Sequence, residues 1–185
     1  MPSVLIPIAD GTEELEAITI IDCLRRAGVE VTVASVMDNS QITAANGTRI
    51  VADCMIADCT GKAFDMITLP GGIPGADHLA ASAELEQLLA AQQQADGWVT
   101  AICASPAVVL GKHGLISGKN ATCYPGFEAG LSDGGASIKE GNVIIDGKLV
   151  TSRGPATALP FALELITQLC GAEKSQEIAS GLLAS

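Results

Sequence analysis

The stretch Ala101-Ile102-Cys103-Ala104-Ser105-Pro106 indicates both how this chain folds and where its chemistry lies. Residues 98–102 (WVTAI) are mostly apolar and predict a short buried strand. Proline is tolerated in the first turn of a helix, where its missing N–H has no intrahelical partner, so residues 106–110 predict a helix. Cys103 then lies in a sharp strand-to-helix turn between small residues. This is the arrangement of a nucleophile elbow with sulfur in place of oxygen, without the glycines of the hydrolase motif.

Cys103 is therefore the expected reactive centre. A thiol at a helix N-terminus meets unpaired N–H donors and the positive end of the helix dipole, and both favour the thiolate. The alternative is a buried cysteine that only fills space as a small apolar side chain. The elbow pattern favours the first interpretation.

Length and composition indicate one α/β domain over residues 1–185, since the chain is 48% hydrophobic, 3% aromatic and contains 20 glycines. A formal net charge of −11, with ten scattered basic residues, argues against a nucleic-acid-binding surface. We expect no signal peptide, and no apolar run approaches the roughly 20 residues needed to cross a membrane. The expected compartment is therefore the cytoplasm, where cysteines stay reduced.

The six cysteines form no CxxC motif and no Cys/His zinc pattern, so neither a metal site nor a disulfide framework is predicted. Gly71-Gly72 lacks the GxGxxG pattern of dinucleotide sites, and no cofactor is expected. Apart from Cys103, the cysteines are interpreted as core residues without a helper group: Cys23, Cys54, Cys59, Cys123 and Cys170.

Predicted strands and helices alternate along the chain. Strands are expected at 3–8, 30–36, 65–69, 98–102 and 149–152, and helices at 12–27, 82–94, 106–110, 155–169 and 173–183. Residues 41–58 predict a β-hairpin excursion that turns at Asn46-Gly47, and shorter strands are expected at 121–123 and 136–149. This order is typical of a doubly wound α/β sandwich, with a mostly parallel central sheet and helices on both faces.

Glu16 lies on the apolar stripe of the helix predicted at 12–27. At about 100° per residue it falls between Ile20 and Cys23, on the face that packs against the sheet. Burial disfavours a charged carboxylate, so Glu16 would stay protonated near neutral pH and donate a hydrogen bond. The alternative, that Glu16 lies at the edge of the stripe and reaches solvent, stays open. Thr12 is the expected N-cap of this helix, and Gly28 its expected stop.

The opposite face of the same helix carries Leu15 and Ile18, which project away from the sheet. Large apolar residues at helical spacing suggest a covering partner. We interpret this face as a homodimer interface through the helix 12–27; coverage by loops of the same chain is the alternative.

Ligands of such folds gather beyond the carboxyl ends of the parallel strands. Gly71-Gly72 follows the strand at 65–69, and the N–H of Gly72 together with that of Ala104 would form an oxyanion hole beside Cys103. His78 and His113 stand at no strand end, so a Cys–His dyad is not expected.

Together these motifs resemble the ThiJ/PfpI superfamily, in the branch of the Parkinson-linked protein deglycase and bacterial YajL. The segments that carry the resemblance are GTEELE (11–16), LRRAG (24–28), LPGG (69–72), AICA (101–104) and TSRGP (151–155). The resemblance implies a flavodoxin-like fold, a homodimer through the first helix, an oxidation-sensitive nucleophile at Cys103 and a protonated glutamate at Glu16. It implies backbone donors at Gly72 and Ala104. The remaining pocket candidates are Gly71, Tyr124, Gly154 and Pro155.

The resemblance also implies deglycase or glyoxalase activity on methylglyoxal or glyoxal and their adducts, with a non-catalytic redox sensor or redox-regulated chaperone as the alternative. Ala104 stands where peptidase-type relatives have a histidine, which argues against peptidase activity; an amidotransferase-like hydrolase would also need a histidine base. Tyr124 stands near a position where this branch often has histidine, and because tyrosine titrates near pH 10, catalysis is expected to be slow. Asn46 replaces an arginine, which weakens an anion pocket.

Overall fold

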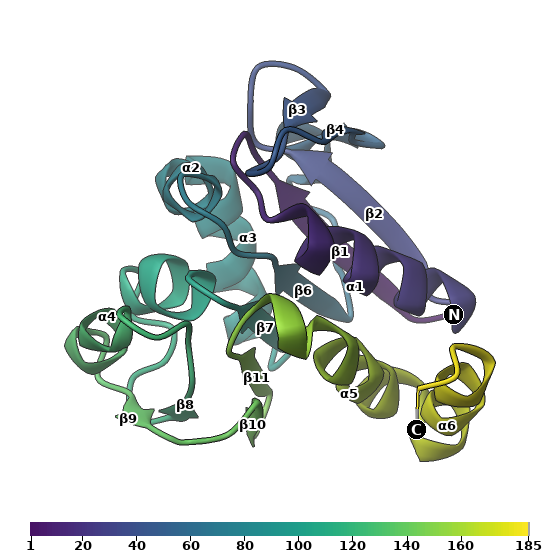
Figure 1. The fold of residues 1–185 in the computed structure, drawn as a ribbon. Helices are drawn as coiled ribbons and strands as arrows, with labels where there is room; N and C mark the ends of the chain where they lie inside the picture. Colours follow the sequence, from purple (N-terminus) through teal and green to yellow (C-terminus); the bar gives the residue numbers. More distant parts are fainter. Residues whose placement is uncertain (185) are drawn as a thin grey trace.

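The computed structural model describes residues 1–184, which contain one seven-stranded sheet in the order β10-β11-β7-β6-β1-β2-β5 (Figure 1). All neighbouring strands are parallel except β10 and β11. The strands of the sheet are β1 (Ser3–Ile8), β2 (Glu30–Ser35), β5 (Cys54–Met55), β6 (Met66–Leu69), β7 (Trp98–Ile102), β10 (Val143–Asp146) and β11 (Leu149–Ser152). The prediction of a doubly wound, mostly parallel α/β sandwich is confirmed.

Strand β1 shows why helices cover both faces of this sheet. Side chains alternate along a strand, and Leu5 joins one apolar core while Val4 and Ile6 join the other. Helices α2 and α3 contribute to the first core, and α1 and α5, which lie side by side in Figure 1, to the second. The helices are α1 (Glu14–Arg26), α2 (Gly75–Ala81), α3 (Ala83–Gln94), α4 (Glu128–Asp133), α5 (Ala158–Cys170) and α6 (Ala172–Gly181), with shorter helical turns η1 (Ile56–Cys59), η2 (Pro106–Gly111) and η3 (Pro155–Thr157).

The first helix begins later than the sequence predicts. Glu13, rather than Thr12, is the N-cap of α1, because its side chain accepts a hydrogen bond from the N–H of Glu16 at 2.8 Å. Thr12 is buried, and its hydroxyl accepts from the N–H of Ala9 at 2.9 Å. The predicted stop at Gly28 is confirmed, since the chain leaves the helix there with a φ of +79°.

The hairpin excursion is shorter than predicted. Only β3 (Gln41–Thr43) and β4 (Arg49–Val51) pair with each other, around a turn that contains Gly47. Strand β5 instead joins the main sheet beside β2. The hairpin packs over the loop after β1, where the N–H of Gly11 donates to the Thr43 carbonyl at 2.8 Å.

Several other segments differ from the sequence predictions. Helix α2 precedes the predicted helix α3, and α4 lies in the region for which only short strands were expected. The short strands β8 (Asn120–Ala121) and β9 (Ser137–Ile138) pair with each other, whereas β10 forms an antiparallel edge of the main sheet. The turn after the elbow is π-helical, and the helix expected from residue 155 begins with η3.

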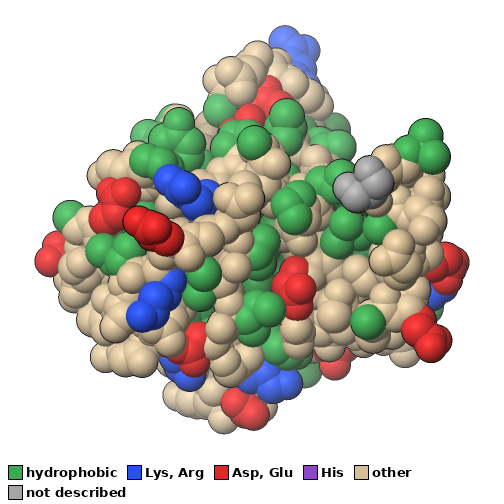
Figure 2. Space-filling view, turned by 60° about the horizontal axis from the view of Figure 1, so that its bottom comes forward, with side chains coloured by type: hydrophobic (Ala, Val, Ile, Leu, Met, Phe, Trp, Pro, Cys, Tyr) green, Lys and Arg blue, Asp and Glu red, His purple; other side chains and the backbone are tan. Residues whose placement is uncertain are grey.

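On the face drawn in Figure 2, lysine and arginine side chains are interspersed with aspartate and glutamate, and they form no continuous basic patch. Within residues 1–184, no helix combines the length and apolar character needed to traverse a bilayer.

Candidate active site

Neighbouring strands β1, β6 and β7 end at one edge of the sheet and bring three loops together there. Cys103, directly after β7, has a φ of +66°, which is strained for a residue with a side chain. Its N–H donates to the Ser152 carbonyl at 3.0 Å, and the buried Ser105 hydroxyl donates to the Pro70 carbonyl at 2.6 Å. These bonds hold the turn in its strained conformation. The sharp elbow predicted at Cys103 is therefore present.

Glu16, from the first turn of α1, is fully buried beside Cys103. Its Oε2 accepts a hydrogen bond from the N–H of Gly71 at 2.8 Å, while Oε1 has no hydrogen-bond partner among the described residues. Burial raises the pKa of Glu16 to about 7, although the Gly71 N–H and the Cys103 thiol act in the opposite direction. The structure thus decides for the core-facing position and against a glutamate that reaches solvent.

The expectation of a thiolate at Cys103 is not met by the structure. Burial, followed by the negative charge of Glu16, raises the pKa of the Cys103 thiol to about 12. The helical turn after the elbow spans only Pro106–Gly111, so its dipole is small and does not outweigh the loss of hydration. The charge effect exists only while Glu16 is ionised, because a protonated carboxyl group no longer repels the thiolate. Cys103 and Glu16 therefore titrate as a pair.

The N–H groups of Gly72 and Ala104 each lower the pKa of Cys103, as donors directed at its sulfur do. The sequence prediction paired these same two groups. Gly72 has a φ of +91°, and a Cβ on it would lie 2.4 Å from the Gly11 carbonyl oxygen. The loop that carries this N–H thus packs directly against the start of α1, where only glycine fits.

Replacing Gly72 by alanine is expected to destabilise the fold by roughly 3 kcal/mol, because backbone strain adds to a clash with backbone atoms. The matched control is Gly28→Ala, since Gly28 also has a positive φ, +79°, but open space around it. That variant should lose only about 1 kcal/mol. Urea unfolding measures both values, and equal losses for the two variants would contradict the packing argument.

The other pocket candidates divide between two places. Tyr124, Gly154 and Pro155 line a hollow of about 230 Å³, next to the elbow because the N–H of Tyr124 donates to the Cys103 carbonyl at 2.8 Å. Gly71 does not line that hollow; its role is the hydrogen bond to Glu16, which the sequence analysis missed. Arg153, also missed, contributes an exposed cation to the lining. Its position directly after the last core strand was the sequence feature that could have identified Arg153 as a site residue.

Neither histidine lies beside Cys103 and Glu16 or lines the hollow beside Tyr124. The ring nitrogens of His113 lie 3.3 Å from a Glu86 carboxylate oxygen and 3.2 Å from the Ala80 carbonyl oxygen. His78 lies in α2, beside a separate small hollow next to Met37. Among residues 1–184, no group of three or more His, Cys, Asp or Glu side chains is arranged to hold a metal ion.

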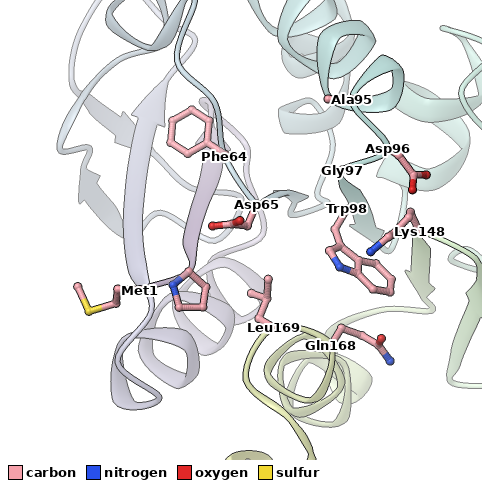
Figure 3. A pocket seen from close by; sticks show the side chains of 11 residues that line it. Met1, Phe64, Asp65, Ala95, Asp96, Gly97, Trp98, Lys148, Gln168 and Leu169 are labelled. Atoms are coloured by element: carbon pink, nitrogen blue, oxygen red, sulfur yellow. The ribbon is translucent and has the colours of Figure 1, made fainter.

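A hollow of about 600 Å³ opens at the opposite end of the sheet, where β7 begins (Figure 3). Trp98 forms part of its wall, with the Lys148 ammonium 4.4 Å from the ring centroid, and Asp65 and Leu169 lie across from them. Trp98 begins β7, and Cys103 directly follows the last residue of this strand. This hollow is therefore remote from the elbow, despite its larger size.

Comparison with known proteins gives the family of the chain. A model of the DJ-1/PfpI family matches residues 2–168. The chain belongs to the DJ-1/PfpI family. This confirms the resemblance inferred from the sequence motifs.

Several members of the DJ-1/PfpI family are similar over the whole chain. Arabidopsis thaliana protein DJ-1 homolog A is 48% identical over 182 residues, which cover 98% of this chain and 46% of that protein. The chain likewise covers 41% of Arabidopsis DJ-1 homolog B, so it spans less than half the length of both. A Caenorhabditis elegans protein named glutathione-independent glyoxalase DJR-1.2 is 36% identical, with 97% of this chain and 94% of that protein covered. The structure of oxidized Toxoplasma gondii DJ-1 superposes with a TM-score of 0.96 and 42% identity over 100% of both chains.

Proposed function

We propose that this chain is a cysteine-dependent glyoxalase or deglycase that acts on methylglyoxal or glyoxal and their adducts. The observation that carries the proposal is the buried Glu16 carboxyl group beside Cys103, in a turn where two backbone N–H groups act on the sulfur. The similar C. elegans protein with a glyoxalase name supports the same activity class. The hollow of about 230 Å³ lined by Tyr124 and Gly154, next to the elbow, suits a small carbonyl compound better than a large ligand.

The chemistry begins with the Cys103 proton. As sulfur attacks the aldehyde carbon, the Glu16 carboxylate takes the thiol proton and then delivers it to the carbonyl oxygen, which gives a hemithioacetal. The N–H groups of Gly72 and Ala104 stabilise the negative charge that develops on that oxygen. Glu16 next removes the proton from the former aldehyde carbon, and the neighbouring carbonyl oxygen takes up a proton, which gives an enediol. Glu16 then returns its proton to the neighbouring carbon as the first hydroxyl loses its own, so the number of protons is unchanged. The product is a thioester of a 2-hydroxy acid, and water hydrolyses it to the acid and the free thiol.

The pKa of about 7 suits Glu16 to this double role, because an acid–base group works best when its pKa lies near the working pH. Oε1 is the oxygen available for the transfer, since Oε2 already accepts from Gly71.

Proton NMR of the wild-type chain with methylglyoxal, without glutathione, tests the activity. Lactate is expected to accumulate well beyond one equivalent per Cys103. A parallel sample in which the aldehyde is first equilibrated with an amino or thiol compound separates the two activities. If lactate forms at the rate expected from the free aldehyde alone, the chain is a glyoxalase. If lactate forms faster than the free aldehyde can account for, the chain also acts on the adduct and is a deglycase. Consumption that stops at one equivalent overturns the proposal of turnover.

The second candidate is a non-catalytic redox sensor or redox-regulated chaperone. The observation that favours it is the burial of the Glu16 carboxyl group beside Cys103, which raises its pKa to about 7. In its protonated form this group would hydrogen-bond a sulfinate on Cys103 and stop oxidation there. This function predicts oxidation-dependent binding of clients without turnover. The six free cysteines, including Cys103, favour a reducing compartment such as the cytoplasm.

We further propose a homodimer through α1, because Leu15 and Ile18 on this helix are 53% and 45% exposed. Light scattering should give twice the chain mass of 18.8 kDa for the wild type and the single mass for Ile18→Glu. Ile145→Glu is the matched control, since Ile145 is 46% exposed at the far edge of the sheet. A monomeric wild type, or dissociation by both substitutions, contradicts this interface.

A further inference from the structure

Two cysteines outside the candidate active site lie in direct contact. The Sγ atoms of Cys54, in β5, and Cys59, at the end of η1, are 3.7 Å apart. The turn between them is closed by the N–H of Met55, which donates to the Asp58 carboxylate at 3.1 Å. The interpretation of Cys59 as a core residue is confirmed, and Cys54 packs half-buried against the same core. The expectation that neither cysteine has a helper group beside it is wrong, because each is the other's neighbour.

The two thiols differ in their access to solvent. Cys54 is half-buried, whereas Cys59 is fully buried. A small oxidant therefore reaches Cys54 first, and Cys59 is held within contact distance behind it. Burial raises the pKa of Cys59 to about 11, so it stays a thiol until its proton has an acceptor.

This pair is separate from the elbow. Strand β5 forms the outer edge of the sheet, and β6, β1 and β2 lie between it and β7, the strand that leads to Cys103. Neither Cys54 nor Cys59 lines the hollow beside Tyr124. Any chemistry of this pair is therefore independent of the proposed activity.

We propose that Cys54 and Cys59 form a dithiol site that hydroperoxides oxidise reversibly to an intramolecular disulfide. In the first step the Cys54 sulfur attacks the peroxide, the O–O bond breaks, and Cys54 sulfenic acid and an alcohol or water form. In the second step the Cys59 sulfur displaces the sulfenic hydroxyl, which leaves as water with the Cys59 proton. Two thiols and one hydroperoxide become one disulfide, one alcohol and one water molecule.

The geometry favours this outcome over deeper oxidation of Cys54. The sulfurs must close from 3.7 Å to a bond of about 2.05 Å, and Cys54 is the less enclosed of the two residues. The disulfide closes a short loop over residues 54–59, at the edge of the sheet. An external dithiol reductant reaches the same exposed sulfur, so the step is reversible.

Peptide mapping of the Cys103→Ser chain, treated with one equivalent of hydrogen peroxide, tests the proposal. This background removes the competing oxidation at the elbow. Trypsin leaves both cysteines in one peptide, residues 50–62, because no lysine or arginine lies between Arg49 and Lys62. We expect this peptide to lose about 2 Da, to resist alkylation, and to recover both thiols after dithiothreitol. The same peptide should crosslink with phenylarsine oxide, which bridges only adjacent thiols.

Two comparisons make the result decisive. Cys170 is the matched lone thiol, also half-buried, and should stay alkylatable under the same treatment. Cys59→Ser should convert Cys54 oxidation to a sulfinate or a mixed disulfide, because the resolving thiol is absent. Oxidation to a sulfinate in the chain that retains both cysteines overturns the proposal, and so does disulfide formation no faster in the folded chain than in guanidinium. A failure here leaves the proposed methylglyoxal activity untouched, because that activity is assayed by lactate with Cys103 intact.

Discussion

Cys103→Ser is expected to lower methylglyoxal turnover at least about 10³-fold, to the background rate, because a serine hydroxyl is far less nucleophilic than a thiol at this site. Serine has nearly the same shape and fits the strained φ of +66° no worse than cysteine does. The fold and the N–H groups of Gly72 and Ala104 should therefore be preserved. The measurement is lactate formation per folded molecule, with the folded fraction taken from circular dichroism.

Cys23→Ser is the control for the loss of a buried thiol. Cys23 is as buried as Cys103, and burial likewise raises its pKa, to about 11, but it lies in α1 without N–H donors aimed at its sulfur. Turnover per folded molecule should stay unchanged in this variant. A similar loss in both variants would mean that buried thiols support the fold and that Cys103 has no chemical role.

The elbow was predictable because two local rules meet at one residue. A buried strand runs directly into a helix that begins with Pro106, and this leaves Cys103 no position except the turn. Glu16 was predictable in part, since the helical period places it on the stripe with Ile20. Whether its carboxyl group reaches solvent depends on the length of the side chain and the packing of the loop that carries Gly71. The helical period carries no information on either.

What the sequence could not show are features set by side-chain direction and by contacts distant in the chain. Glu13 is the N-cap of α1 because the Thr12 hydroxyl instead accepts a hydrogen bond from the N–H of Ala9. The contact between Cys54 and Cys59 depends on the path of η1, since a spacing of five residues matches no regular helix face. The raised pKa of Cys103 follows from burial, which outweighs the helix-terminus effect that the sequence pattern predicts.

Glu16→Gln should lower turnover by about 10²- to 10⁴-fold. Glutamine can accept the Gly71 hydrogen bond, but its amide group cannot act as a general acid or base near neutral pH. The same substitution lowers activity but is expected to raise stability relative to the wild type as pH rises. Burial raises the pKa of Glu16 from 4.5 to about 7, so between these values the folded chain holds a proton that the unfolded chain has released. The resulting stability is fully present below the unfolded pKa and lost as pH rises through the folded one.

As pH rises through this range, the wild type loses about 3 kcal/mol of its free energy of unfolding, whereas the glutamine variant does not. Urea unfolding at a series of pH values should therefore show the variant gaining about that much relative to the wild type between about pH 4 and pH 8. Other titrating groups cancel in this difference, since both chains share them. A constant difference would mean that Glu16 titrates alike in the folded and unfolded chains. Retained turnover with the expected stability change would leave Glu16 buried and protonated but remove it from the reaction.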